Sequence, residues 1–435
     1  MTDKTLHKAL VIYDKAWAMA LPLLRLSRRL KDGFSQRKLE SPLPVADIWI
    51  QAASGGEAYL AWTLLEHLRT SGPVRVLITT NTRQGMDIIG SASTALAATN
   101  PDIDLLPAWF PFDRPSIMEK AVLRVNPKLA VLLEGELWPG FMQALKRRSC
   151  PVFIINGRMT DKSMTAYGRF PGACKALRPD RVLAISPEDG RRFERVFGKE
   201  VVSLMTNIKF DRLAVDRENK GAGIPNGFME QMIPSGSRFL VLGSVRREEE
   251  PKILQIIQKV HRLRPDTIIG LFPRHLERVD YWKKTLSGCG LNWHLRSGMK
   301  PPVQNSDVIL WDVFGELSTA YAAADAVFVG GSLAPLGGQN FLEPLVYGTV
   351  PVIGPSYENF AWIGEDIFRQ KMAIRTRNHR DAADGLIRQL DHPAPKSEIA
   401  RKAKAFIAAR QGGSRTACEA IEQVLRTAIT AEPKP

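Results

Sequence analysis

Glu57 is the first residue whose position suggests proton transfer. It ends the segment ASGGE, residues 53–57, which follows a predicted strand over Asp47–Gln51 and precedes a predicted helix. The glycines of this turn, with Ser54 and Gly56 beside Glu57, would let a substrate approach the backbone, where the carboxylate could accept a proton from a hydroxyl group. The alternative is an acid that stabilises the first helical turn. Because a helix N-terminus lowers a carboxyl pKa, a base here also requires burial or nearby acids.

Two further acids, Glu134 and Glu136, follow a predicted strand over Leu129–Leu133. In an extended chain their side chains would lie on the same face. Acids at the end of a buried strand are costly unless they are paired or used, so this pair is a second candidate for a site. A structural salt bridge to an arginine remains an equal alternative.

Two basic residues are candidates for binding a negatively charged donor. Lys209 lies in the segment 207–211, and Arg274 follows a predicted strand over Thr267–Phe272, within Pro273-Arg274-His275. A lysine facing a cleft can neutralise developing charge, and arginine suits phosphate or carboxylate. Ordinary surface roles are open for both.

A glycine-rich stretch in the second half suggests a phosphate site. Gly330-Gly331-Ser332 is followed by a second glycine pair and then by Asn340, Phe341, Leu342 and Glu343. Free backbone N–H groups of such a loop can bind phosphate. Asn340 and Glu343 also have the spacing of a capping box, and capping and binding can coexist.

Metal and cofactor chemistry is not indicated. The D-x-D motif Asp102-Ile103-Asp104 precedes an apolar run, and the seven histidines show no paired ligand spacing. The chain also has no phosphate-binding P-loop and no G-x-S-x-G elbow. We therefore expect no metal and no cofactor.

The elements that position these residues alternate between short apolar strands and amphipathic helices, which predicts two doubly wound α/β domains with binding crevices at the carboxyl ends of their strands. A Gly- and Pro-rich linker over 218–237 separates them.

We expect a membrane-interface segment at 1–40, an N-terminal domain at 41–217, a C-terminal domain at 238–405, and a C-terminal helix and tail at 406–435. Ser397–Arg426 is predicted to be helical. The remaining predicted strands are Val74–Thr79, Val152–Ile155, Arg181–Ile185, Val201–Leu204, Phe239–Leu242, Val308–Trp311, Ala326–Val329 and Val350–Ile353.

Charge indicates the kind of partner. The net charge of +15 and the pI near 9.7 favour an anionic partner. The four scattered cysteines fit a reducing compartment. In the apolar stretch Ala9–Leu26, Trp17 and several leucines precede Arg25, Arg28, Arg29 and Lys31, as in a helix that lies in a membrane interface. The alternative is a helix packed on the body of the protein.

Taken in order, these segments resemble the 3-deoxy-D-manno-octulosonic acid (Kdo) transferase family, inverting glycosyltransferases of the GT-B architecture. The resemblance rests on residues 53–57, 134–139, 156–158, 207–211, 273–275, 314–317 and 330–344. Four positions depart from the usual motifs: Gly55, Gly135, Phe314 and Gln339 replace the common valine, threonine, methionine and histidine. The charged residues remain, so these departures bear more on fine specificity than on reaction class.

The resemblance implies two Rossmann-like domains facing across a cleft, and transfer of Kdo from CMP-Kdo to a phosphorylated lipid A precursor at the cytoplasmic face of the bacterial inner membrane. Glu57 would be the general base, with Glu136 and Lys209 stabilising the transition state and Ser54, Gly56 and Glu134 as additional candidates. The implied CMP-binding residues are Pro273, Arg274, Phe314, Gly315, Glu316, Asn340, Phe341, Leu342 and Glu343. Alternatives are a GT-B enzyme with another nucleotide sugar and, favoured by charge alone, a nucleic-acid-binding protein; low aromatic content argues against nucleic acid as a partner.

Overall fold

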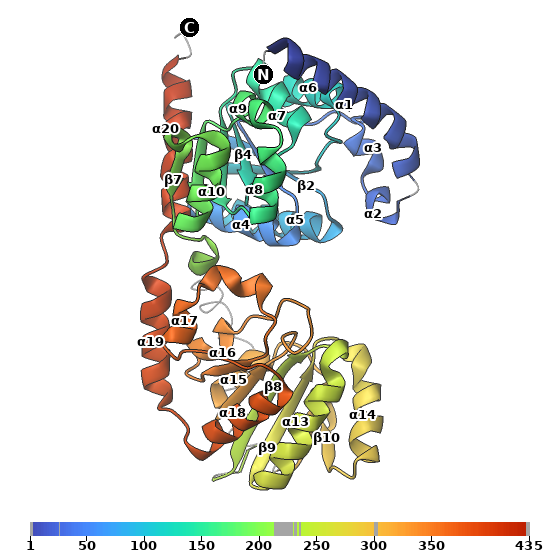
Figure 1. Ribbon diagram of the computed structural model, residues 1–435, viewed down its shortest axis with the longest axis vertical. Coiled ribbons are helices and arrows are strands. Elements are labelled where there is room, and N and C mark those ends of the chain that lie inside the picture. The colour runs from blue at the N-terminus through green and yellow to red at the C-terminus, as the bar shows by residue number, and fades with distance from the viewer. Residues whose placement is uncertain are drawn as a thin grey trace. The chain divides into compact units, whose positions relative to one another are not determined.

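The computed structural model describes residues 3–25, 27–212, 229, 233–234, 236–299 and 303–431. The chain forms two compact units, and Figure 1 shows the elements of each. Unit 1 comprises Met1–Ala214 with Arg410–Pro435, and unit 2 comprises Val215–Ala409. Most of the predicted linker, residues 218–237, lies outside the described residues.

Unit 1 contains a seven-stranded sheet in the order β3-β2-β1-β4-β5-β6-β7, and every neighbouring pair is parallel. Its strands are β1 (Ile48–Ala52), β2 (Val74–Thr80), β3 (Ile103–Trp109), β4 (Leu129–Leu133), β5 (Val152–Gly157), β6 (Arg181–Ala184) and β7 (Val202–Leu204). β3 was not predicted from the sequence. It is an edge strand with partly exposed positions, where Asp104 and Pro107 interrupt the apolar run.

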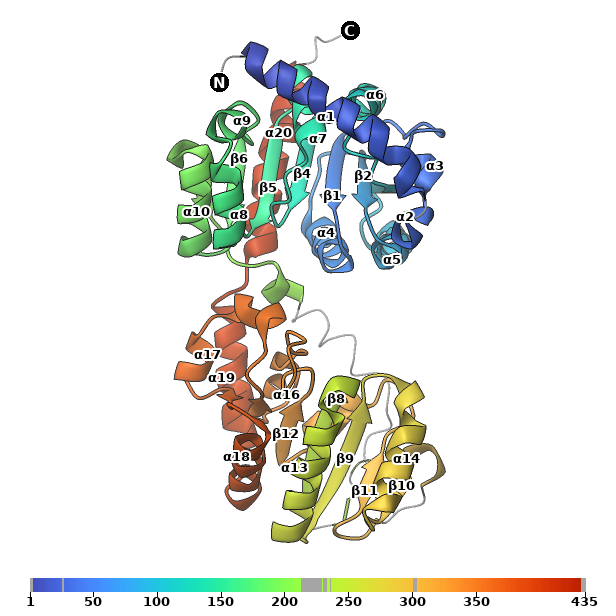
Figure 2. The ribbon, with the colours of Figure 1, turned by 45° about the vertical axis from the view of Figure 1, so that its right-hand side comes forward.

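Helices cover both faces of this sheet, as Figure 2 shows. Alternate residues of β1 point into different cores: Ile48 and Ile50 into one, and Trp49 into the other. This burial on both faces explains the continuous apolar strands of the sequence. The first core includes α4 (Gly55–His67), α5 (Arg83–Thr99) and α20 (Gly413–Ala431), and the second includes α6 (Pro115–Val125), α7 (Pro139–Arg147) and α10 (Pro187–Phe197).

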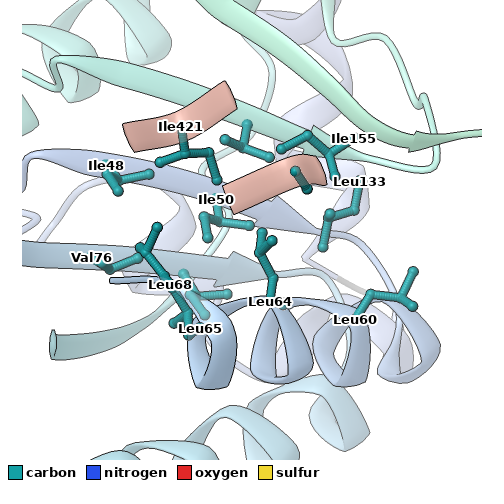
Figure 3. Close-up of a cluster of buried hydrophobic side chains, with 14 of the residues drawn as sticks. Ile48, Ile50, Leu60, Leu64, Leu65, Leu68, Val76, Leu133, Ile155 and Ile421 are labelled. Atoms are coloured by element: carbon teal, nitrogen blue, oxygen red, sulfur yellow. The ribbon is translucent and has the colours of Figure 1, made fainter. Parts of the chain in front are cut away.

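The predicted helix Ser397–Arg426 is two helices, α19 (Lys396–Ala408) and α20. The chain turns at Gly412, which has φ +99°, and the carboxylate of Asp211 accepts hydrogen bonds from the N–H groups of Gly412 and Ser414 at 2.7 and 2.6 Å. Asp211 therefore caps the start of α20. In Figure 3, Ile421 of α20 points into the cluster that contains Ile50. The end of the chain thus completes the core of unit 1.

Unit 2 contains a second parallel seven-stranded sheet, in the order β10-β11-β9-β8-β12-β13-β14. Its strands are β8 (Arg238–Val245), β9 (Thr267–Pro273), β10 (Trp293–Leu295), β11 (Val308–Leu310), β12 (Ala326–Val329), β13 (Pro351–Ile353) and β14 (Ile374–Arg375). The two edge strands, β10 and β14, are only three and two residues long and were not predicted. A core on one face joins the sheet to α13 (Glu250–Leu263), α14 (Val279–Gly288) and α18 (His379–Asp391).

The N-terminal helix α1 (Asp3–Leu24) packs on unit 1 along one side (Figure 2). The hydroxyl group of Tyr13 donates to Asp113 at 3.1 Å, Asp14 forms an ion pair with Arg114 at 3.0 Å, and Leu10 is buried. The helix therefore packs on the body of the protein, as one of the two alternatives predicts. None of the described helices combines the length and apolarity needed to cross a bilayer.

Candidate active site

The acids of unit 1 lie at the point where the strand order of its sheet reverses. β1 and β4 are neighbours, but the chain continues from β1 toward β2 on one side and from β4 toward β5 on the other. Ligands of open parallel sheets bind beyond the carboxyl ends of the strands at such a point. Glu57 follows β1 and Glu134 follows β4, so the topology brings the predicted acids to one edge.

Glu57 is buried in the first turn of α4, with 6% of its surface exposed. Ser54 is the N-cap, and its hydroxyl oxygen accepts from the Glu57 N–H at 3.3 Å. The carboxylate of Glu57 accepts in turn from Ala53 N–H at 2.8 Å and from the Ser54 hydroxyl at 2.9 Å. A β-carbon on Gly55 would lie 2.8 Å from the exposed Gln84 side chain, which would have to shift to make room for a larger residue. Glu57 thus stabilises the first turn of α4, as the alternative to a catalytic role predicts. This structural role is compatible with a second role as a base.

The pKa of Glu57 is raised to about 7, chiefly by burial. The hydrogen bonds from Ala53 and Ser54 oppose the rise, while the charges of Glu134 and Glu136 add to it. Burial and the nearby acids therefore offset the lowering of the Glu57 pKa that a helix N-terminus causes. A carboxyl group with a pKa near neutral is well matched to proton transfer at physiological pH.

The loop that carries Glu134 and Glu136 is not extended, so the prediction that they share a face of an extended chain is wrong. Glu134 has φ +57° and Gly135 has φ +112°, and both lie in a turn that begins where β4 ends. A β-carbon at Gly135 would lie 3.1 Å from the Phe193 ring, which explains the glycine. The turn separates the two acids into different environments.

Glu134 forms the structural ion pair that was left open as an alternative. Its Oε1 lies 2.6 Å from Lys209 Nζ and its Oε2 lies 3.5 Å from the guanidinium group of Arg158. Glu136 is exposed, yet partial desolvation of its carboxyl group raises its pKa, and the charge of Glu134 raises it further. Of the two acids, Glu136 is the one that is exposed to solvent.

Lys209 follows β7 and is held by two asparagines. Asn207 Oδ1 accepts from the Lys209 N–H, and Asn156 Oδ1 accepts from the Ile208 N–H, each at 3.0 Å. Asn156 and Arg158 were not predicted as site residues, although their segment was among those that carry the resemblance. They anchor the loop of Lys209 and share the charge of Glu134, a role that only the fold reveals.

In unit 2 the strand order reverses between β8 and β12, and a buried acid fills the first glycine loop after β12. Glu249 accepts hydrogen bonds from the N–H groups of Gly331 at 2.6 Å and of Ser332 and Leu333 at 3.2 Å. It also accepts from Arg246 N–H at 2.9 Å. The prediction that Gly330-Gly331-Ser332 offers free N–H groups to phosphate is therefore wrong. Nothing in the sequence around Glu249 pointed to this contact.

We expect Glu249→Gln to destabilise unit 2 by about 2–4 kcal/mol. The amide group can replace one carboxylate oxygen as an acceptor, but its NH₂ would face the two N–H donors that now share Glu249 Oε2. Urea unfolding should show a lower midpoint, whereas Glu248→Gln, an exposed neighbour, should leave it unchanged. Equal midpoints for both variants would contradict this account of the loop.

The start of α16 (Leu342–Val346) also differs from expectation. Glu343 accepts from the Ser318 hydroxyl at 2.7 Å instead of closing a capping box with Asn340, whose Oδ1 accepts from Leu342 N–H at 3.2 Å. Phe341 and Leu342 have buried side chains. Any contact between these two residues and CMP would therefore come from their backbone.

The other predicted CMP-binding residues follow β9 and β11, which are adjacent strands. Arg274 is exposed and forms no ion pair within the part of the chain that the structure describes, while Pro273 ends β9 in a buried position. Phe314 is 78% exposed, beside Gly315 at φ +88°. Glu316 is instead held by Arg296 at 2.8 and 2.9 Å and by the Trp311 indole at 2.8 Å. Arg274 is thus the member of this set with a guanidinium group available to an anion.

Across the described ranges, no group of three or more His, Cys, Asp or Glu side chains could hold a metal ion. The catalytic candidates of unit 1 are instead joined by the charges and hydrogen bonds described above.

A family model described as 3-deoxy-D-manno-octulosonic-acid transferase (kdotransferase) matches residues 25–212. The 3-deoxy-D-manno-octulosonic acid transferase of Bordetella pertussis is 31% identical over 405 residues, which cover 90% of this chain and 91% of that relative. The chain belongs to the Kdo transferase family. It is therefore a glycosyltransferase of lipopolysaccharide biosynthesis.

Solved structures of other proteins share the two-domain α/β fold of this Kdo transferase. A UDP-GlcNAc 2-epimerase from Neisseria meningitidis, 12% identical, has a TM-score of 0.55 and covers 87% of this chain and 99% of its own. A glycosyltransferase from Rickettsia africae, 10% identical, has a TM-score of 0.54 and covers 88% of this chain and 99% of its own. The predicted α/β class and GT-B architecture are thus confirmed by neighbours that include glycosyltransferases.

Proposed function

We propose that this Kdo transferase moves Kdo from CMP-Kdo to a phosphorylated lipid A precursor, with inversion at the anomeric carbon. The observation that carries the proposal is the buried Glu57, whose pKa of about 7 is set by burial and by two acids at the same sheet edge. A sugar hydroxyl is a weak nucleophile and needs such a base.

In the proposed reaction, Glu57 removes the proton of the acceptor hydroxyl as its oxygen attacks the anomeric carbon. The new glycosidic bond forms while the bond from that carbon to the phosphate oxygen of CMP breaks, and CMP leaves with the bonding electrons. Attack from the face opposite CMP inverts the configuration. No step needs a metal held by the protein, because cationic side chains can stabilise the charge that develops on the leaving group.

Each charged candidate is given its own role in this proposal. Arg274, with its exposed guanidinium group, would bind the phosphate of CMP together with backbone groups near Asn340. Lys209 and Glu136 would act on the reacting sugar. Since Lys209 is paired with Glu134, its charge is held in a fixed position before substrate arrives, which is how preorganised electrostatic stabilisation operates.

We also propose that α1 rests on the cytoplasmic surface of the inner membrane. Its solvent-exposed side carries Ile12, Met19 and Leu23, each at least two-thirds exposed, at a spacing that places them on one helical stripe. The exposed cations Lys15 and Arg25 adjoin the stripe in sequence. Such a helix can both pack on the protein and enter an anionic interface.

Met19→Asp should weaken binding to vesicles that contain anionic lipid by roughly tenfold or more, because it replaces the proposed apolar contact with lipid by a negative charge that the membrane repels. Co-sedimentation measures this binding. Leu263→Asp, which changes an exposed apolar residue of unit 2, is the matched control. If the two variants bind alike, α1 is not the membrane contact.

The direct test of the proposed function is product analysis by mass spectrometry after incubation with CMP-Kdo and the lipid A precursor. We expect an acceptor heavier by one or more Kdo residues, and the inverted anomeric configuration by NMR. A donor competition with UDP- and GDP-sugars tests the alternative of another nucleotide sugar. Transfer from one of those donors, with none from CMP-Kdo, would overturn the proposal.

A further inference from the structure

An apolar cavity of about 330 Å³ lies within unit 1, beneath the N-terminal half of α1. Its walls come from α1, from the start of α7, and from α8 (Asp161–Gly168), α9 (Pro171–Ala176) and the end of α10. Almost all of its lining surface is apolar, with Leu10, Met142, Phe170 and Leu177 among the lining residues. Such a lining suits a hydrocarbon chain.

Polar contacts next to the cavity hold α1 on the rest of unit 1. The carboxylate of Asp113 is buried and accepts from the N–H groups of Gly140 and Phe141 at 3.1 and 2.8 Å, and from the Tyr13 hydroxyl at 3.1 Å. One side chain thus joins α1 to the start of α7, and the ion pair of Asp14 with Arg114 holds α1 a second time. An unfilled apolar cavity costs stability, so a cavity fixed by such contacts suits a ligand that fills it.

The cavity also adjoins the candidate active site. Leu137, which lines it, directly follows Glu136. Tyr167 is another lining residue, and its phenol group forms a hydrogen bond with the Leu137 backbone. The pKa of Tyr167 is raised mainly by burial, and the charge of Glu136 raises it further. An apolar chain in the cavity would therefore belong to a molecule whose polar part can reach Glu136.

At its outer side the cavity reaches the surface of unit 1. Ala9 and Phe170 line it and are both exposed, and their sequence neighbours Lys8 and Arg169 are exposed cations. Taking a methylene group as about the size of a water molecule in the liquid, roughly 30 Å³, the cavity has room for about ten methylene groups. These features fit one fatty-acyl chain of an anionic lipid.

We propose that this cavity binds a single acyl chain of the acceptor lipid and so positions its sugar at Glu136 and Glu57. The inference rests on the proposed function, because it assumes a lipid acceptor, and it adds a specificity site for the chain to that function. Acyl recognition would let the enzyme distinguish the assembled lipid from the free phosphorylated disaccharide.

The test compares transfer to the acylated precursor with transfer to its acyl-free disaccharide. Ala173→Phe places a ring in part of the cavity, whereas Ala176→Phe makes the same change at an exposed position of α9 outside it. We expect Ala173→Phe to lower kcat/KM for the acylated acceptor by roughly tenfold or more while leaving the acyl-free acceptor within about twofold. Ala176→Phe should change neither. Equal effects of Ala173→Phe on both acceptors, or no effect, would overturn the cavity proposal while transfer itself stands.

A second readout does not depend on catalysis or on a folded Ala173→Phe variant. Cys174 lines the cavity, Cys150 and Cys418 are buried, and the exposed Cys289 can be replaced by serine. Dodecanoic acid should slow the alkylation of Cys174 by N-ethylmaleimide in the Cys289→Ser protein, and acetate should not. If the wild type transfers Kdo to neither acceptor, the proposed function is wrong. The alkylation rate of Cys174 would still show whether the cavity binds an acyl chain. Alkylation at the same rate with and without dodecanoic acid would overturn it.

Discussion

Glu57→Gln should lower kcat for Kdo transfer by roughly 10²–10⁴-fold, the usual contribution of a general base. Glutamine keeps an oxygen that can accept from Ala53 N–H or the Ser54 hydroxyl, so the first turn of α4 should persist. It cannot take the proton of the acceptor hydroxyl. Steady-state kinetics should therefore show lost turnover with nearly unchanged binding of CMP-Kdo.

The stability of the Glu57→Gln variant separates chemistry from misfolding. Because the folded-state pKa of Glu57 is raised from 4.5 to about 7, its contribution to stability is fully present below about pH 4.5 and is lost as the pH rises through about 7. At pH 8 the uncharged glutamine should thus be at least as stable as the buried carboxylate. Glu66→Gln, at the far end of α4, is the matched control for activity. Full activity of Glu57→Gln would remove Glu57 as the base.

Lys209→Met should lower kcat/KM by roughly 10²–10³-fold, as expected when a preorganised stabilising group is removed from a site. The substitution deletes the cation 2.6 Å from Glu134 and leaves that carboxylate with Arg158 alone. The less compensated charge of Glu134 should also raise the pKa of Glu57 further. Kinetics at pH 7 and at pH 9 should therefore differ more for the variant than for the wild type.

Two further variants show whether the loss of activity in Lys209→Met comes from the missing charge or from lower stability. Lys209→Arg keeps the charge and should retain more activity than Lys209→Met. Lys146→Met breaks a comparable ion pair, with Asp180 at 2.9 Å, at a more exposed place in unit 1 and should cost little. An equal loss in Lys146→Met and Lys209→Met would show that the effect is one of general stability.

The α/β fold was predictable because its central strands are buried on both faces and read as continuous apolar runs, as in β1 and β4. Three of the four described edge strands escaped prediction, because β3 is partly exposed and β10 and β14 are very short. The break between α19 and α20 depends on Asp211, about two hundred residues earlier in the chain. No local pattern contains that contact.

The candidate site was predictable as a set of positions but not as a set of contacts. Glu57 and Glu134 were expected at strand ends, and parallel pairing of β1 with β4 brings them to one edge. The positive φ of Glu134 redirects it to Lys209, and the buried Glu249 takes the N–H groups of a glycine loop that sequence alone assigned to phosphate. Both depend on tertiary contacts, which propensity and spacing do not encode.

The pH dependence of kcat/KM, compared between the wild type and Glu134→Gln, tests most directly whether Glu57 is a base tuned by its acidic neighbours. For the wild type we predict activity that rises with pH through about 7, since Glu57 must be deprotonated to act. In Glu134→Gln, loss of the neighbouring negative charge should move this rise to lower pH. A wild-type profile without a rise near pH 7, or an identical profile in the variant, would contradict the account.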